Sequence, residues 1–133
     1  MKDYLPFLKW LSGQKSSMVD LVIQWAKINT HAFNLSGLEL FSQEVEKAFS
    51  IFNEKIERIP LPSMEMVNSQ GLLEEKPLSH ALKIQKRPEA PSQIFLMIHM
   101  DTVYPAETQA TVSLVEKGAL LRGPGVTDAK GGL

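Results

Sequence analysis

The feature that most constrains how this chain folds is an apolar run that ends in two chemically active residues. Residues 94–98 read Ile-Phe-Leu-Met-Ile, and a short run of this kind between turn residues predicts a strand buried on both faces. His99 and Asp101 follow it directly. Polar groups at the end of a buried strand are where open α/β sheets place their chemistry. We therefore expect His99 and Asp101 to be functional.

A glycine-rich segment about twenty residues later supplies a second carboxylate, Asp128. One imidazole and two carboxylates form a donor set that suits zinc or a harder divalent cation. Glycines in such a loop permit close backbone packing and positive φ angles. Lys130 is expected to be structural, because an ammonium group has no lone pair to give a metal. Taken singly, His99 also fits a buried packing histidine and the two aspartates fit turn residues.

Two motifs together resemble a known family. His-Met-Asp-Thr-Val at 99–103 and Gly-Pro-Gly-Val-Thr-Asp-Ala-Lys-Gly-Gly at 123–132 resemble the two N-terminal signatures of the M20 metallopeptidase family. The family includes glutamate carboxypeptidases, acetylornithine deacetylase and succinyl-diaminopimelate desuccinylase. The flanking Tyr104-Pro105 and Arg122 look most like the carboxypeptidase G2 type.

The resemblance implies a role for each of the three polar residues. His99 and Asp128 would be metal ligands, with Asp128 bridging two divalent ions, and Asp101 would be the catalytic-site carboxylate that orients His99. The cofactors implied are two divalent metal ions, zinc in the first place, with cobalt or manganese left open. Related enzymes also hold the peptide bond after the bridging aspartate in the cis form, so we expect a cis Asp128–Ala129 bond.

The function implied is metal-dependent hydrolysis of amide or peptide bonds by metal-activated water. The substrate would be a small peptide or an N-acyl amino acid, as for a carboxypeptidase or a deacylase. The family's general base and remaining ligands follow the second signature. Residues 1–133 are therefore expected to be the N-terminal part of a catalytic domain, inactive when isolated, with any homodimer formed through a missing domain. The alternative is a non-catalytic remnant or interaction domain that keeps the motif loops.

Composition excludes several other classes of protein. The 133 residues suffice for one domain, and 44% hydrophobic with 22% charged residues is typical of a globular chain. A net charge of −1 without a basic stripe argues against a nucleic-acid partner. The absence of cysteine excludes disulfides and thiolate zinc sites. No apolar run approaches the roughly eighteen residues of a membrane span, and we expect no membrane partner and a cytoplasmic location.

The pattern of apolar residues predicts helices first and strands later. Helices are expected at 4–11, from a Ser17 cap to about residue 26, and from a capping box that begins at Ser36 to about residue 53. Strands are expected at 55–59 and 80–86, a loop at 63–78, and a hairpin of 111–115 with 119–122 around Lys117-Gly118. This order predicts an α/β fold, a helix-covered mixed sheet. The resemblance refines it to the first half of a three-layer zinc-peptidase domain.

Other eye-catching residues have simpler interpretations. His31 is expected on a surface loop, His80 in strand packing, and the Glu74-Glu75 pair in a solvated loop. The glycine-rich loop lacks the Gly-Lys-Ser/Thr order of a phosphate-binding loop. The aromatic residues at helical spacing are expected in the core; they are Trp10, Trp25, Phe41 and Phe52.

Overall fold

The chain opens with two helices that follow one another with a single bend. α1 (Leu5–Gly13) passes through Gln14 directly into α2 (Lys15–Ala26). The computed structural model describes residues 3–108, 111–115 and 120–133. The Ser17 cap was a wrong prediction, because Ser17 lies inside the first turn of α2.

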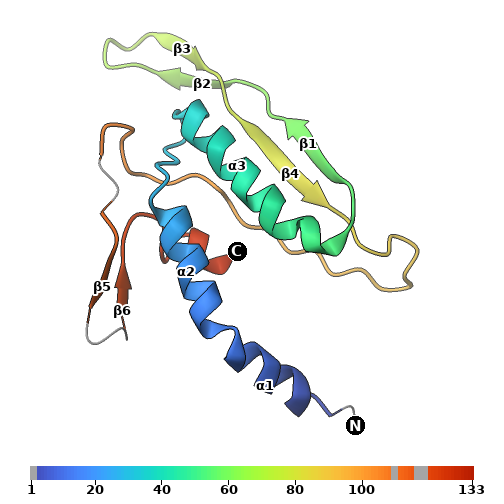
Figure 1. Ribbon diagram of the computed structural model, residues 1–133. Coiled ribbons are helices and arrows are strands. Elements are labelled where there is room, and N and C mark those ends of the chain that lie inside the picture. Colours follow the sequence, from blue (N-terminus) through green and yellow to red (C-terminus); the bar gives the residue numbers. More distant parts are fainter. Residues whose placement is uncertain (1–2, 109–110, 116–119) are drawn as a thin grey trace.

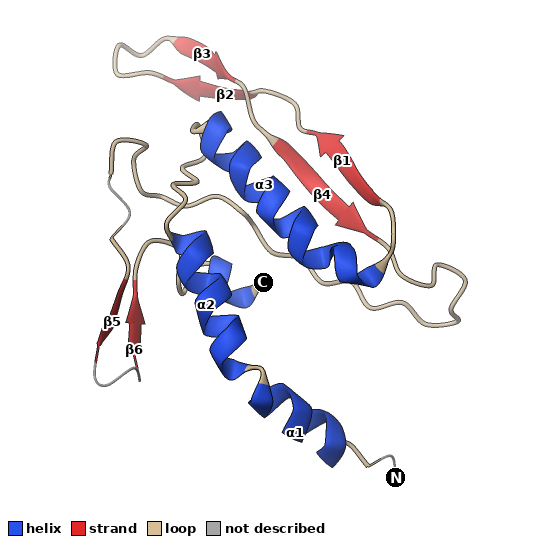
Figure 2. Cartoon of the chain, viewed as in Figure 1, coloured by secondary structure: helices blue, strands red, loops and turns tan. Residues whose placement is uncertain are grey.

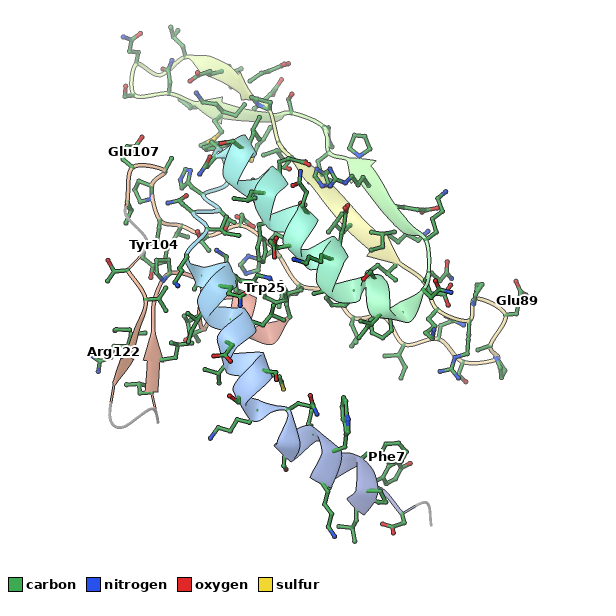
Figure 3. The ribbon with its side chains drawn as sticks, in the orientation of Figure 1. Phe7, Trp25, Glu89, Tyr104, Glu107 and Arg122 are labelled. Carbon is green, nitrogen blue, oxygen red and sulfur yellow. The ribbon has the colours of Figure 1, made fainter. Side chains whose placement is uncertain are left out.

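α1 projects from the rest of the molecule and exposes its apolar side chains (Figure 1). Phe7 points into solvent at 69% exposure, whereas Trp25 lies between elements at 2% (Figure 3). Trp10, expected in the core, is 66% exposed. The spacing of apolar residues identifies an apolar face of a helix, but it does not say whether anything covers that face.

α3 (Leu35–Phe49) is the longest helix and continues into the 3₁₀ turn η1 (Ser50–Phe52). This helix was predicted, but its cap was not, because Asn34 and not Ser36 begins it. The Asn34 side-chain oxygen accepts the Gly37 N–H at 3.1 Å, which satisfies a donor that the first turn leaves free. Glu39, the expected partner of Ser36, instead pairs with Arg58.

β1 (Ile56–Pro60) and β4 (His80–Ile84) form an antiparallel pair that lies beneath α3 (Figure 2). Both were predicted from their alternating residues. Arg58 of β1 holds the helix to this pair, since its guanidinium contacts the carboxylates of Glu39 and Glu46 on α3. A planar guanidinium presents several fixed donors and so bridges two acids at once.

The loop expected at 63–78 is instead a hairpin of β2 (Met64–Val67) and β3 (Leu73–Lys76). Its turn is built by Asn68, whose side-chain oxygen accepts the N–H groups of Gln70 and Leu72. The two consecutive acids Glu74 and Glu75 hide the alternation of β3 in the sequence. They are exposed as expected, although they belong to a strand.

Near the C-terminus, β5 (Ser113–Val115) pairs with β6 (Leu120–Arg122) and the 3₁₀ turn η3 (Lys130–Gly132) follows. The predicted hairpin is confirmed, and its expected Lys117-Gly118 turn lies outside the described residues.

In the part of the chain that is described, the strands form three antiparallel pairs and, with the three α-helices, a small mixed α/β domain. No helix among these residues has the length and apolar content that crossing a membrane requires.

The core is small and lies where α2 meets α3. Trp25 and Phe41 pack edge to face, with ring centroids 5.7 Å apart and planes at 87°, the geometry that aromatic quadrupoles favour. Val45 completes the buried cluster, and three partly buried side chains pack against it from elsewhere in the chain. They are Leu82 of β4, Met100 beside His99, and Leu133 after the glycine-rich loop.

The apolar run 94–98 is not the buried strand that its sequence predicts. Ile94, Phe95, Leu96 and Met97 have an irregular backbone and are 84–87% exposed. A strand buried on both faces requires a hydrogen-bonding neighbour along its edges and a layer over each face. The described residues provide neither for this run, so its backbone forms no ladder.

The difference between buried and exposed aromatic residues generates a first prediction. Phe41→Ala should lower the free energy of unfolding by about 3–5 kcal/mol, because it removes a fully buried ring. The matched change Phe7→Ala, also in a helix, should change it by no more than about 0.5 kcal/mol. Urea denaturation followed by circular dichroism measures both values. Equal losses would contradict the assignment of the core.

The exposed run generates a second prediction. An uncharged apolar segment of this kind is prone to intermolecular strand pairing. Leu96→Lys should therefore slow aggregation of the purified chain, measured by light scattering, while its unfolding free energy stays within about 0.5 kcal/mol. Ile51→Lys is the control, since Ile51 is 81% exposed but lies outside the run. An equal effect of both changes would show that net charge alone is responsible.

Candidate functional site

His99 and Asp101 lie on the outer face of a short extended segment. Met100 packs on the core and Thr102 is 4% exposed, so these two face inward. The Thr102 N–H donates to the Thr30 carbonyl at 2.8 Å, within a parallel bridge between this segment and His31. Because alternate residues of an extended chain project to opposite sides, His99 and Asp101 share the exposed side, as predicted.

Asp128 lies in a tight loop that follows β6. Gly125 has a φ of +73°, a conformation that residues with a Cβ rarely adopt. Its carbonyl accepts the Lys130 N–H at 2.8 Å. At Gly131 a Cβ would meet the Val126 carbonyl oxygen at 2.2 Å, so only glycine fits there. The Asp128–Ala129 bond is cis, as expected.

Lys130 turns inward from this loop and is 1% exposed. Its ammonium donates to the carbonyls of Trp25 at 3.0 Å and Ile28 at 2.6 Å, and it lies 5.0 Å from the centroid of the Phe41 ring. Burial lowers the pKa of Lys130 to about 8, and it therefore remains largely protonated at neutral pH. Its carbonyl contacts confirm the prediction of a structural lysine.

The two motif segments meet at the His99 ring. Nε2 lies 2.8 Å from the Asp128 Oδ1 atom, although the two residues are 29 positions apart in the sequence. Nδ1 lies 3.0 Å from the Asp101 carbonyl oxygen and 3.3 Å from the Asp101 Oδ1 atom. The expected convergence of His99 and Asp128 is therefore confirmed, and Asp101 lies where it can orient the ring.

This arrangement favours a protonated imidazole. The hydrogen bond to the Asp128 carboxylate raises the pKa of His99 above its ordinary value of 6.5, with a smaller contribution from the Asp101 carbonyl. When both ring nitrogens carry a proton, each donates to its own acceptor. The site is open to solvent, since the side chains of His99 and Asp128 are 50% and 80% exposed.

The same residue types are metal donors. With Nδ1–H bonded to Asp101, the Nε2 atom that contacts Asp128 would become a metal donor on loss of its proton. Among the described residues, no group of three or more His, Cys, Asp or Glu side chains is arranged to hold an ion. His99 and Asp128 supply two donors, fewer than the three or four protein ligands of a zinc site.

Comparisons of the chain with family models, with curated proteins and with solved structures found no match.

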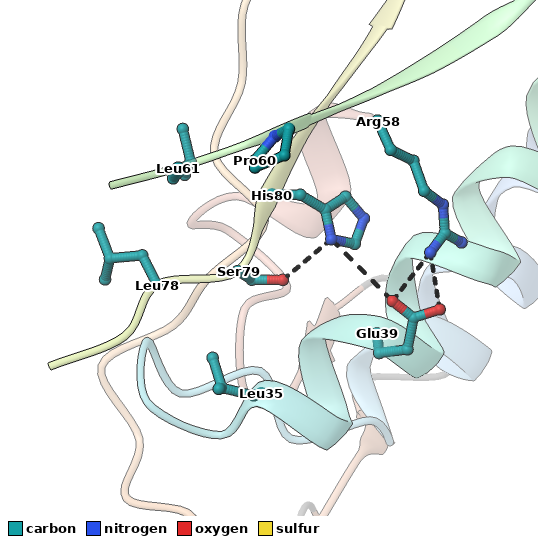
Figure 4. Close-up of a pocket in the computed structure, with 8 residues that line it drawn as sticks. All are labelled: Leu35, Glu39, Arg58, Pro60, Leu61, Leu78, Ser79 and His80. Carbon is teal, nitrogen blue, oxygen red and sulfur yellow. Dashed lines mark hydrogen bonds and ion pairs between the residues drawn. The ribbon is translucent and has the colours of Figure 1, made fainter. Parts of the chain in front are cut away.

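A second polar group, missed in the sequence, lines a pocket of about 500 Å³ between α3, β1 and β4 (Figure 4). Ser79 Oγ is 3.3 Å and a Glu39 carboxylate oxygen 4.0 Å from Nδ1 of His80. A catalytic triad places nucleophile and acid on opposite ring nitrogens, whereas here both approach the same one. Hydrogen bonds from Arg58 and Gln43 lower the pKa of Glu39. We assign this group to packing, as expected for His80.

His31 is half-buried, and its Nδ1 accepts the Phe33 N–H at 3.4 Å. The surface position expected for it is thus only partly right. Thr30 and Thr102 were also missed as residues that hold the site. Both are buried, and for Thr102 the available signal was its alternation with Met100.

The His99–Asp128 contact predicts a dependence on pH. Asp128→Asn should lower the pKa of His99, followed by NMR titration of its ring protons in metal-free protein, because a neutral amide no longer stabilises the imidazolium. Since the folded-state pKa is raised, the pair contributes stability below pH 6.5 and loses it as pH rises through the raised value. Asp20→Asn, on the exposed face of α2, is the control. An unchanged His99 titration in Asp128→Asn would contradict the contact.

Proposed function

We propose that this chain contributes His99, Asp101 and Asp128 to a metal-dependent hydrolase of amide or peptide bonds, of the carboxypeptidase or N-acyl-amino-acid deacylase type. The observation that carries the proposal is the 2.8 Å approach of His99 Nε2 to the Asp128 carboxylate. This contact joins the two motifs that resemble the M20 signatures.

Each residue has a defined task in this proposal. His99 and Asp128 bind metal, and Asp101 holds Nδ1 of His99 so that Nε2 faces the ion. The bound ions, zinc or alternatively cobalt or manganese, would supply Lewis acidity and an activated water. The exposure of Asp128 leaves its second oxygen accessible, which a bridging carboxylate requires. The general base and further ligands would come from outside these 133 residues.

The proposal extends to the fold. The finer fold that the resemblance implies, the first half of a three-layer zinc-peptidase catalytic domain, is part of the proposal. The same proposal includes a small peptide or N-acyl amino acid as substrate and a cytoplasmic location. It also includes a homodimer formed through another domain, with no nucleic-acid or membrane partner.

Metal binding tests the site. The 133-residue chain should bind one Zn²⁺ ion, and bind it weakly. Isothermal titration calorimetry measures both the stoichiometry and the affinity. His99→Ala and Asp128→Ala should abolish this binding, and Asp101→Asn should weaken it about 10- to 100-fold. His31→Ala is the matched control. Equal Zn²⁺ binding by wild type and Asp128→Ala would refute the assignment, and tight binding of two ions would refute the predicted incompleteness.

Activity tests the reaction. The 133 residues alone should not hydrolyse N-acyl amino acids or dipeptides. In any longer polypeptide that contains them, Asp128→Ala should abolish turnover, because a missing bridging ligand removes the metal site. Asp20→Ala should leave turnover intact. Hydrolysis that persists in Asp128→Ala would exclude the proposed mechanism.

The exposed run favours a second candidate, a non-catalytic interaction domain. Four successive apolar residues at 84–87% exposure form the kind of surface that another polypeptide covers. Under this alternative His99 and Asp128 remain an ion pair, and no variant of either changes zinc binding. The calorimetric experiment above therefore separates the two candidates.

A further inference from the structure

The position of Asp128 cannot come from its own packing. Its side chain is 80% exposed, and such a side chain has few neighbours to fix its direction. The next two residues are different, since Ala129 is 9% and Lys130 1% exposed. Apart from the hydrogen bond to His99 itself, these buried neighbours are the groups that can hold the Asp128 backbone in place.

Lys130 makes the contacts that can do this. Its ammonium donates to the carbonyl of Trp25, in the last turn of α2, and to that of Ile28, two residues after the helix ends. A positive charge is favoured at the C-terminus of a helix. The face of Phe41 adds a cation–π contact at 5.0 Å. A buried ammonium requires hydrogen-bond acceptors in place of water, and these two carbonyls supply them and tie the loop to this part of the chain.

The His99 segment is held at the same part of the chain. Thr102 donates its N–H to the Thr30 carbonyl, two residues beyond the Ile28 carbonyl that Lys130 uses. We propose that Lys130 is a positioning residue, whose buried ammonium sets the distance between Asp128 and His99 by attaching the Asp128 loop to the end of α2. Insofar as it concerns a metal centre, this inference rests on the proposed function. The contact between His99 and Asp128 that Lys130 would position is present without metal.

The first test uses wild-type, metal-free protein. The ammonium of a lysine held by two carbonyls should exchange its protons slowly and give a resolved ¹⁵Nζ NMR signal near neutral pH. Exposed lysines such as Lys27 exchange too fast to give one. The absence of a Lys130 ¹⁵Nζ signal, as expected for Lys27, would overturn the proposal.

The second test removes the ammonium. Lys130→Met keeps a long apolar side chain, and in a folded variant the nuclear Overhauser contacts between the His99 ring and the Asp128 β-protons should be lost. Lys27→Met should keep them. Contacts that persist in folded Lys130→Met would overturn the proposal, because the loop would then be positioned by packing alone.

Rescue distinguishes positioning from general stability. Lys130→Ala lacks three methylenes and the ammonium, which propylammonium replaces. Millimolar propylammonium should restore the His99–Asp128 contacts, and 1-propanol of the same size should not. Restoration by both compounds would show that filled volume matters and not the charge. Restoration by neither would show that the covalent link to the loop is what matters. Wild type that fails to bind Zn²⁺ while these tests succeed would refute the metal assignment and leave the positioning role intact.

Discussion

The candidate site depends on carbonyl groups in the last turn of α2 and in the segment that follows the helix. Buried carbonyls require hydrogen-bond donors. The Trp25 carbonyl accepts the Ile28 N–H at 3.1 Å, and the two motif segments supply further donors to this stretch. Lys130 reaches Trp25 and Ile28, and the Thr102 backbone reaches Thr30. The same short connection between α2 and α3 thus orders two segments that are distant in the sequence, and His99 meets Asp128 as a result.

Local signals in the sequence predicted a good part of this arrangement. The glycine-rich loop, the shared side of His99 and Asp101, and the structural role of Lys130 follow from elementary rules. These rules are φ preferences, alternation along an extended chain, and the inability of an ammonium to bind a metal. The helix α3 and the strands β1 and β4 carry regular apolar spacing and were equally accessible. In each case the residues that decide the structure are neighbours in the sequence.

Most of the wrong predictions concern burial, which depends on covering residues that local sequence patterns do not reveal. Trp10 and residues 94–98 have the spacing and composition of buried elements, but burial requires a covering surface, and none of the described residues supplies one for them. The predicted cap of α3 was wrong for another reason. Asn34 and Ser36 are both residue types that cap helices, and two candidates so close together cannot be ranked from sequence. The β2–β3 hairpin was hidden by two acids that face solvent.

The contacts of Arg58 have a consequence for how α3 is seated. Glu39 and Glu46 are seven residues apart, two turns along one side of the helix. A guanidinium that reaches both opposes rolling and sliding of α3 over β1 and β4 more than a single ion pair does. Phe41 projects from the same helix toward Trp25 and the Lys130 ammonium. The seating of α3 on β1 and β4 therefore also bears on where this buried ring lies.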